Sequence, residues 1–226
     1  MKNEAYLIAG GPPLNRPVMI RELSAALKAA GKENPSVAYI GTASSDNRPF
    51  FVMLKALIKE AGAGEVKFLK LAQNRADVEG AKQYLTECDV VFLSGGEVDD
   101  GMFWLRKHGL CDFLRDLFSG GKLFVGMSAG SIMMGTKWIT AKGTNDITKA
   151  ELFDCLGIIP DVFDTHAEGE DWIELKTTLR LMGPGASGHG LESGTVIRDG
   201  GDGDLVILEG HTVSYKNRDG EVSLSE

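Results

Sequence analysis

The chain has 226 residues, of which 43% are hydrophobic and 25% are charged, and its formal net charge at pH 7 is -8. This composition is typical of a soluble globular protein, and no apolar run approaches the length of a membrane span. An acidic chain without a basic cluster is a poor partner for nucleic acid or an anionic membrane surface. We therefore expect a single domain over residues 1–226 that binds small molecules or peptides, and its oligomeric state stays open.

Cysteine usage and the amino terminus bear on the cellular compartment. Cys88, Cys111 and Cys155 are widely spaced and form no C-x-x-C pair. This spacing predicts neither a disulfide framework nor a zinc site. The apolar run at residues 5–9 is too short for a secretory signal. We expect a cytoplasmic protein that uses no metal and no cofactor.

Short apolar runs alternate with helical patterns in the first half of the chain. Strands are predicted at residues 5–9, 36–40, 66–71, 89–93 and 123–125, and helices at 49–61, 75–86 and 102–118. Such alternation is typical of a three-layer α/β fold, in which helices cover both faces of a mostly parallel sheet. Ligands bind at the carboxyl ends of parallel strands. Several of these ends carry glycine, namely Gly10-Gly11, Gly41, Gly95-Gly96 and Gly126.

The second half of the chain has a less regular pattern. Residues 158–163 are predicted as a strand and 172–182 as a helix, and short strands are predicted at 194–196, 204–208 and 211–215. Turn residues separate these last runs. We expect antiparallel strands in the C-terminal part.

One local motif points to chemistry. Residues 122–131, KLFVGMSAGS, form an apolar run that leads into Ser128, which stands between Gly126 and Gly130. This spacing is the nucleophile-elbow pattern, in which small residues permit a sharp strand-to-helix turn that exposes the serine hydroxyl. The turn also directs backbone N–H groups toward an oxyanion. A tight turn whose serine only caps the next helix would have the same sequence.

A serine hydroxyl becomes a nucleophile when a base accepts its proton, and that base is usually a histidine oriented by a carboxylate. The chain has four histidines, at positions 108, 166, 189 and 211. His108 ends a helical stretch, which explains it as a structural residue. His166 follows the predicted strand at 158–163 and is expected at the same rim as Ser128.

Two chain orders remain open for the acid and the base. In the first, Ser128 is followed by His166 and then by Glu192. The second is the α/β-hydrolase order, with Asp161 or Asp164 as the acid and His189 or His211 as the base.

Five segments occur in a fixed order along most of the chain: VVFLSGG at 90–96, LRKHGL at 105–110, GMSAGS at 126–131, DTH at 164–166 and GLESGT at 190–195. Together they resemble peptidase family S51, which contains dipeptidase E and cyanophycinase. The resemblance implies a class I glutamine amidotransferase-like α/β fold. It also implies a serine peptidase that hydrolyses short peptides through an acyl-enzyme.

The resemblance assigns a role to individual positions. It implies that Ser128 is the nucleophile, His166 the general base and Glu192 the acid that orients it. The backbone N–H groups of Gly96 and Ala129 match the oxyanion hole. Two further acids, Asp164 and Glu168, are close enough to His166 in sequence to replace Glu192. An α/β-hydrolase-type esterase and a catalytically inactive relative that binds a small ligand remain as alternatives.

The specificity pocket departs from dipeptidase E, where Asn-Thr follows the glycine pair and an arginine-bearing segment follows the histidine. Here Glu97 follows the pair, and the segment after His166 is acidic. An aspartyl-selective pocket needs a cation, for which Lys176 and Arg180 are the candidates. Acidic residues near the rim predict instead a basic side chain or a free amino terminus; they are Glu97, Asp99, Asp100, Glu168, Glu170 and Asp171. They are also compatible with a solvated helix N-terminus.

Overall fold

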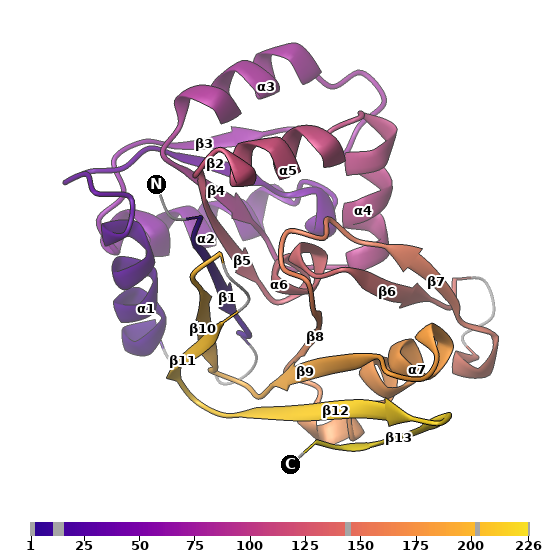
Figure 1. Cartoon of the computed structure of the whole chain (residues 1–226). Coiled ribbons are helices and arrows are strands. Elements are labelled where there is room, and N and C mark those ends of the chain that lie inside the picture. The colour runs from indigo at the N-terminus through magenta and orange to yellow at the C-terminus, as the bar shows by residue number, and fades with distance from the viewer. Residues whose placement is uncertain (1–2, 11–15, 143–145, 202–203, 226) are drawn as a thin grey trace.

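The computed structural model describes residues 3–10, 16–142, 146–201 and 204–225. Within them the main sheet has seven strands in the order β11-β10-β1-β5-β4-β2-β3 (Figure 1). The strands are β1 Ala5–Ile8, β2 Val37–Ile40, β3 Val66–Leu69, β4 Val90–Leu93, β5 Leu123–Met127, β10 Val196–Asp199 and β11 Leu205–Glu209. The first five pair in parallel, and β10 and β11 are antiparallel to their neighbours. The predicted parallel sheet is confirmed.

Helices cover both faces of this sheet. The helices α1 Arg16–Lys28 and α2 Arg48–Glu60 pack on one face, and α3 Val78–Glu87, α4 Val98–Lys107, α5 Cys111–Ser119 and α6 Ala129–Met134 pack on the other. Because successive strand side chains point to opposite faces, β4 sends Phe92 into the first layer and Leu93 into the second. Every residue of the central strands is therefore buried, which explains their continuous apolar runs.

A second sheet lies beside the first, with the order β13-β12-β9-β8 (Figure 1). Its strands are β8 Val162–Thr165, β9 Ser187–Leu191, β12 Thr212–Arg218 and β13 Glu221–Leu224, and α7 Ile173–Met182 packs against them. A hairpin, β6 Lys137–Thr140 and β7 Glu151–Asp154, contacts α7. Three short 3₁₀ turns complete the described elements: η1 Thr42–Ser44, η2 Ile147–Lys149 and η3 Glu168–Glu170.

The structure corrects several predicted elements. The single helix predicted at 102–118 is two helices, because Gly109 adopts φ 63° and ends α4. The strand before His166 belongs to the second sheet and pairs in parallel with β9. The later strands β10, β11, β12 and β13 are antiparallel to their neighbours, which confirms the prediction for the C-terminal part. The helix α1 and the strands β6, β7, β9 and β13 were not predicted. Gly11, at the first glycine-bearing strand end, lies outside the described residues.

No helix in the described ranges is both long enough and apolar enough to cross a membrane. The assignment of residues 1–226 to one domain stays a prediction.

One carboxyl group lies in the interior of the second sheet. Asp164 on β8 is 3% exposed, and its Oδ1 accepts a hydrogen bond of 2.7 Å from the N–H of Thr165. Its Oδ2 has no hydrogen-bond partner in the described part of the chain. Burial raises the pKa of Asp164 to about 7; the Thr165 N–H opposes this shift, and the charge on Glu174 adds to it. The ionised carboxylate is thus poorly accommodated by the fold.

The pKa of Asp164 predicts how stability changes with pH. The folded state binds the carboxyl proton of Asp164 more tightly than the unfolded state does. The contribution of this proton to the free energy of unfolding is therefore greatest below the unfolded pKa of 3.8 and is lost as the pH rises toward 7. At about 1.4 kcal/mol per pKa unit, the loss is up to about 4 kcal/mol. We expect Asp164→Asn to be close to the wild type in free energy of unfolding at pH 4.5, and more stable by about 2 kcal/mol or more at pH 8.

Urea denaturation at both pH values measures this difference. Asp116→Asn removes an exposed carboxyl from α5 and serves as the control. A stability difference between Asp164→Asn and wild type that is the same at both pH values would contradict the interpretation.

Candidate active site

Ser128 lies at a sharp turn between β5 and α6, with φ 50° and ψ −121°. This conformation is strained for a residue with a side chain. A Cβ at Gly126 would lie 2.7 Å from the backbone of Gly130, and a Cβ at Gly130 would lie 2.1 Å from the carbonyl oxygen of Leu93. The backbone therefore requires glycine at both flanking positions, which is the physical reason for the spacing of the motif.

Hydrogen bonds to Ile8 hold this turn in place. The Ser128 N–H donates to the Ile8 carbonyl at 2.8 Å. One turn later, Ser131 Oγ accepts from the Ile8 N–H and donates to the Ile8 carbonyl, both at 3.1 Å. Ser131 is fully buried, so these bonds are shielded from water. The start of α6 is thereby fixed to the carboxyl end of β1.

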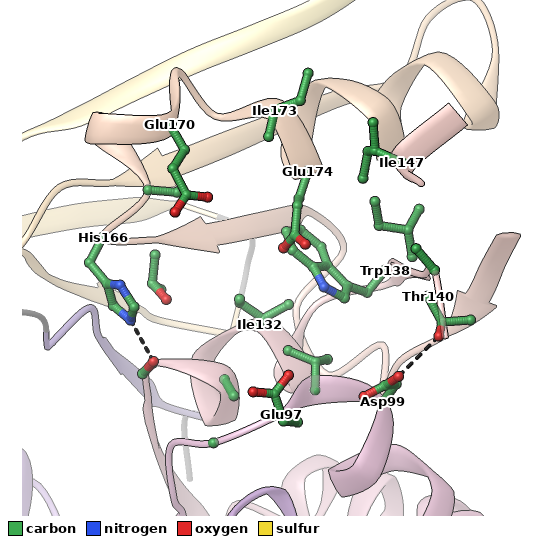
Figure 2. A pocket seen from close by; sticks show the side chains of 18 of the residues that line it. Glu97, Asp99, Ile132, Trp138, Thr140, Ile147, His166, Glu170, Ile173 and Glu174 are labelled. Atoms are coloured by element: carbon green, nitrogen blue, oxygen red, sulfur yellow. Dashed lines mark hydrogen bonds between the residues drawn. The ribbon is translucent and has the colours of Figure 1, made fainter. Parts of the chain in front are cut away.

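His166 faces Ser128 from the second sheet. Its Nε2 lies 2.7 Å from the Ser128 Oγ, within hydrogen-bonding distance (Figure 2). The His166 backbone has φ 46°, and its N–H donates to the carbonyl of Leu191 at 2.8 Å. Because the ring nitrogen Nε2 can accept the hydroxyl proton, the geometry fits activation of Ser128 by His166 as a general base.

The two candidate acids that lie beyond His166 in the chain have different surroundings. The Glu192 N–H donates to the carbonyl of His211 at 3.1 Å, but its carboxylate has no hydrogen bond or ion pair in the described part of the chain. Glu168 Oε1 accepts a hydrogen bond of 3.2 Å from the N–H of Ser193. Although partial burial opposes the shift, hydrogen bonds from Ser193 and the charge of His166 lower the pKa of Glu168. Among the described residues, neither carboxylate forms a hydrogen bond or ion pair with the His166 ring.

Gly96 and Ala129, the residues predicted to form the oxyanion hole, line the same cavity as Ser128. Ala129 begins α6, and Gly96 lies in the loop after β4. Neither backbone N–H has an acceptor among the residues that the structure describes. Gly96 has φ 141°, and a Cβ there would lie 2.1 Å from the Ala43 carbonyl oxygen. This position accepts only glycine, and both N–H groups are available to a ligand.

A cavity of about 630 Å³ opens beside Ser128 and His166. Apolar side chains form part of its wall: Val98, Ile132, Trp138, Ile139, Ile147 and Ile173. Four carboxylates also line it, from Glu97, Asp99, Glu170 and Glu174, together with the ammonium group of Lys142. Figure 2 shows the side chains of Glu97, Glu170 and Glu174 directed into the cavity.

Among the described residues, Asp99 is the one carboxylate of these four that is paired. Asp99 Oδ2 accepts a hydrogen bond of 3.0 Å from Thr140 Oγ1 and lies 3.2 Å from Lys142 Nζ, which also pairs with Asp100. Within the described chain, Glu97, Glu170 and Glu174 form no side-chain hydrogen bond or ion pair. The cavity therefore has a negative electrostatic potential that its single lysine does not neutralise.

Glu174 experiences this potential most directly. The residue as a whole is accessible to solvent, but its carboxyl lies within the cavity. Burial of that carboxyl raises the pKa of Glu174, and the negative charges of Glu170, Glu97 and Asp99 raise it further. Burial is thus the larger cause, and the like charges that line the cavity add to it.

The two cations predicted for substrate binding lie elsewhere. Lys176 Nζ pairs with Asp171 at 2.8 Å and lies 4.9 Å from the centre of the Tyr215 ring. Arg180 is exposed on α7, and neither residue lines the cavity. Of the three residues predicted to contact substrate, Glu97 alone lies in the cavity wall.

Two of the other histidines have ring nitrogens within hydrogen-bonding distance of another group. His108 Nε2 lies 2.8 Å from the carbonyl oxygen of Leu71, in agreement with a structural role at the end of α4. His189 Nδ1 lies 2.9 Å from Ser214 Oγ within the second sheet. In the described chain, the only histidine ring hydrogen-bonded to Ser128 is that of His166.

Several cavity residues were not predicted from the sequence. Strand β6 contributes Trp138 and Thr140, and Lys142 lies two residues after this strand. The start of α7 contributes Ile173 and Glu174. Glu174 lies four residues after Glu170, so the acidic pattern could have been extended to it. The hairpin residues carry no comparable local signal.

Comparison with known proteins gives the family. The sequence matches the model of peptidase family S51 over residues 7–206. It is 27% identical over 203 residues to a cyanophycinase of Synechococcus elongatus, an alignment covering 83% of this chain and 63% of the relative. It is also 27% identical over 140 residues to a peptidase E of Haemophilus influenzae, covering 56% of this chain and 63% of the relative. The alignments thus span 63% of the length of these curated relatives.

A solved structure has the same fold. A peptidase from an acI-B1 Actinobacterium superposes with a TM-score of 0.72 at 17% identity, covering 100% of this chain and 98% of that one. At this identity, the two proteins are similar in the arrangement of their helices and strands. The family match extends over most of the sequence and includes the elbow at Ser128, His166 and the segment around Glu192, and the chain accordingly belongs to peptidase family S51.

Proposed function

We propose that this protein is a serine peptidase that hydrolyses short peptides through an acyl-enzyme. The observation that carries the proposal is the 2.7 Å separation of Ser128 Oγ and His166 Nε2 at the wall of a large cavity. Membership of peptidase family S51, and relatives named peptidase E and cyanophycinase, support the reaction class. The cavity volume of about 630 Å³ falls in the range of small-ligand sites and suits a short peptide.

In the proposed reaction, Ser128 Oγ attacks the carbonyl carbon of the scissile peptide bond while His166 Nε2 accepts the hydroxyl proton. The tetrahedral intermediate collapses, the C–N bond breaks, and His166 returns the proton to the leaving amine. A water molecule then attacks the acyl-enzyme with His166 as the base. The second collapse releases the acid product and restores the Ser128 hydroxyl.

The N–H groups of Gly96 and Ala129 are proposed to stabilise the oxyanion of both intermediates. Each such donor contributes about 3 kcal/mol to transition-state stabilisation in comparable hydrolases. Support comes from the absence of an acceptor for either N–H in the described chain, and from the backbone of Gly96, which admits no side chain. The donors are thus oriented before substrate binds.

A carboxylate is proposed to orient His166 and stabilise its protonated form. The family resemblance assigns this role to Glu192, and Glu168 is the second candidate, because the charge of His166 contributes to lowering its pKa. Glu168 is held by the N–H of Ser193, the residue next to Glu192. A hydrogen bond therefore connects the two chain segments that carry these acids.

The alternatives find less support in the geometry. An esterase with the α/β-hydrolase order would use His189 or His211, but neither lines the cavity beside Ser128, whose Oγ lies 2.7 Å from His166 Nε2. An inactive binding protein would not need Ser128 in a strained conformation within hydrogen-bonding distance of an imidazole.

Replacing His166 tests the base directly. Without an acceptor for the serine proton, we expect His166→Ala to lower kcat/KM for dipeptide hydrolysis by at least about 1000-fold. His189→Ala removes a histidine outside the cavity and should leave kcat/KM within about threefold of the wild type. Thermal unfolding of both variants checks that they fold. Full activity in His166→Ala, with loss in His189→Ala, would favour the esterase order instead.

Neutral isosteres separate the two acids. If Glu168 orients the imidazole, Glu168→Gln should lower kcat by about 100-fold or more with little change in KM, because the lost interaction is made in the transition state. Glu192→Gln should then lower kcat by less than about tenfold. The opposite ranking would return the role to Glu192, and a loss confined to KM in both variants would exclude both as the orienting acid.

A further inference from the structure

We propose that the cavity beside Ser128 selects peptides with a lysine or arginine side chain adjacent to the scissile bond. The inference rests on the proposed peptidase function, because it names the substrate class of the same cavity. Its evidence is nevertheless separate from the Ser128–His166 pair, since it comes from the charges and the apolar wall of the cavity.

The charge balance of the wall is the first step. Glu97, Glu170 and Glu174 lack internal counterions in the described chain, and the nearby Lys142 is already paired with Asp99 and Asp100. Like charges that share a partly desolvated space repel one another, and a bound cation relieves that repulsion. Burial raises the pKa of Glu174, and repulsion from Glu170, Glu97 and Asp99 raises it further.

The three carboxylates converge from different parts of the fold. Glu97 follows β4 and the glycine pair, Glu170 ends η3, and Glu174 lies in the first turn of α7. Figure 2 shows the side chains of Glu97 and Glu174 approaching each other across the cavity, with Glu170 on the side of His166. One solvated helix N-terminus does not explain this arrangement, because Glu97 is the N-cap of α4, Glu174 belongs to α7, and both side chains point into the same cavity.

The apolar part of the wall indicates which kind of cationic side chain fits the cavity. Ile132, Trp138, Ile147 and Ile173 line the cavity together with the carboxylates (Figure 2). Lysine and arginine pack their aliphatic stems against such surfaces and keep the charged group in a polar site. A long amphipathic side chain therefore matches this lining better than a compact ammonium group would.

The same wall disfavours an acidic side chain. A pocket for aspartate needs an available cation, preferably an arginine that binds the carboxylate with two hydrogen bonds. Lys176 and Arg180 lie outside the cavity, and Lys142 is occupied by two aspartates. An aspartyl substrate would enter a region of negative potential.

Matched dipeptides test this selection. We would measure kcat/KM for X-Ala and Ala-X, in which X is lysine, norleucine or aspartate, with each peptide also in N-acetylated form. Norleucine has a hydrocarbon chain as long as the lysine stem and carries no charge. In one of the two positions, we expect kcat/KM for the lysine peptide to exceed that for the norleucine peptide by at least tenfold. The same ratio should hold for the acetylated peptides. The aspartate peptide should have the lowest kcat/KM.

Variants assign the preference to the carboxylates. Glu174→Gln and Glu97→Gln should each reduce the lysine-to-norleucine ratio by at least fivefold, because each removes one charge that faces the cation. Glu33→Gln makes the same change in net charge at an exposed position on another part of the surface, and it should leave the ratio unchanged. Equal hydrolysis of lysine and norleucine peptides by the wild type, or a preference that acetylation abolishes, would overturn the proposal.

A binding measurement separates this proposal from the peptidase proposal. Calorimetry with Ser128→Ala would compare Nα-acetyl-lysine amide with Nα-acetyl-norleucine amide. Selective binding of the lysine ligand, when the wild type hydrolyses no peptide, would refute the peptidase function and retain the cation pocket. Hydrolysis of dipeptides by the wild type, without lysine selectivity in binding or turnover, would refute the cation pocket and retain the peptidase.

Discussion

Ser128 occupies a backbone conformation that serine normally avoids, and the elements around it have to hold it there. A residue at φ 50° outside the regular regions costs about 1–3 kcal/mol. The backbone approaches closely at Gly126 and Gly130, and this contact fixes the position of α6 relative to β5. The buried Ser131 then fastens that helix to β1 through two hydrogen bonds. The hydroxyl of Ser128 is presented to the cavity because packing in the main sheet stabilises a strained turn.

The partner of that hydroxyl belongs to a different sheet. His166 follows β8, which is paired with β9, and its N–H is bound to the Leu191 carbonyl. The nucleophile and the proposed base therefore meet only when α6 and β8 are packed together, which the contacts between these two elements achieve. The same packing brings the β6 hairpin and the first turn of α7 around the cavity, so one arrangement of the two sheets sets both the proposed chemistry and the electrostatics of the pocket.

The parts of this structure that local sequence could predict are those decided by local forces. The central strands follow from continuous apolar runs, and the elbow follows from two glycines at fixed spacing around Ser128. The break at Gly109 depends on a single positive φ within an otherwise helical pattern, so one helix was predicted where there are two. The placement of Trp138 and Glu174 in one cavity depends on contacts between distant segments, which a single sequence does not encode locally. The choice between Glu168 and Glu192 depends on such contacts too, since Glu168 is close to His166 in sequence whereas Glu192 comes near it through the pairing of β8 with β9.

Electrostatics link the proposed chemistry to the proposed specificity, because the cavity beside the serine carries carboxylates that have no partner among the described residues. The account nevertheless depends first on a reactive serine whose proton passes to His166. The most direct measurement is the labelling of Ser128 by a fluorophosphonate, followed by mass-spectrometric mapping of the modified peptide. The account predicts one adduct on Ser128 in the wild type and labelling at least about 1000-fold slower in His166→Ala. Equal labelling rates in the two proteins, or an adduct on another residue alone, would contradict it.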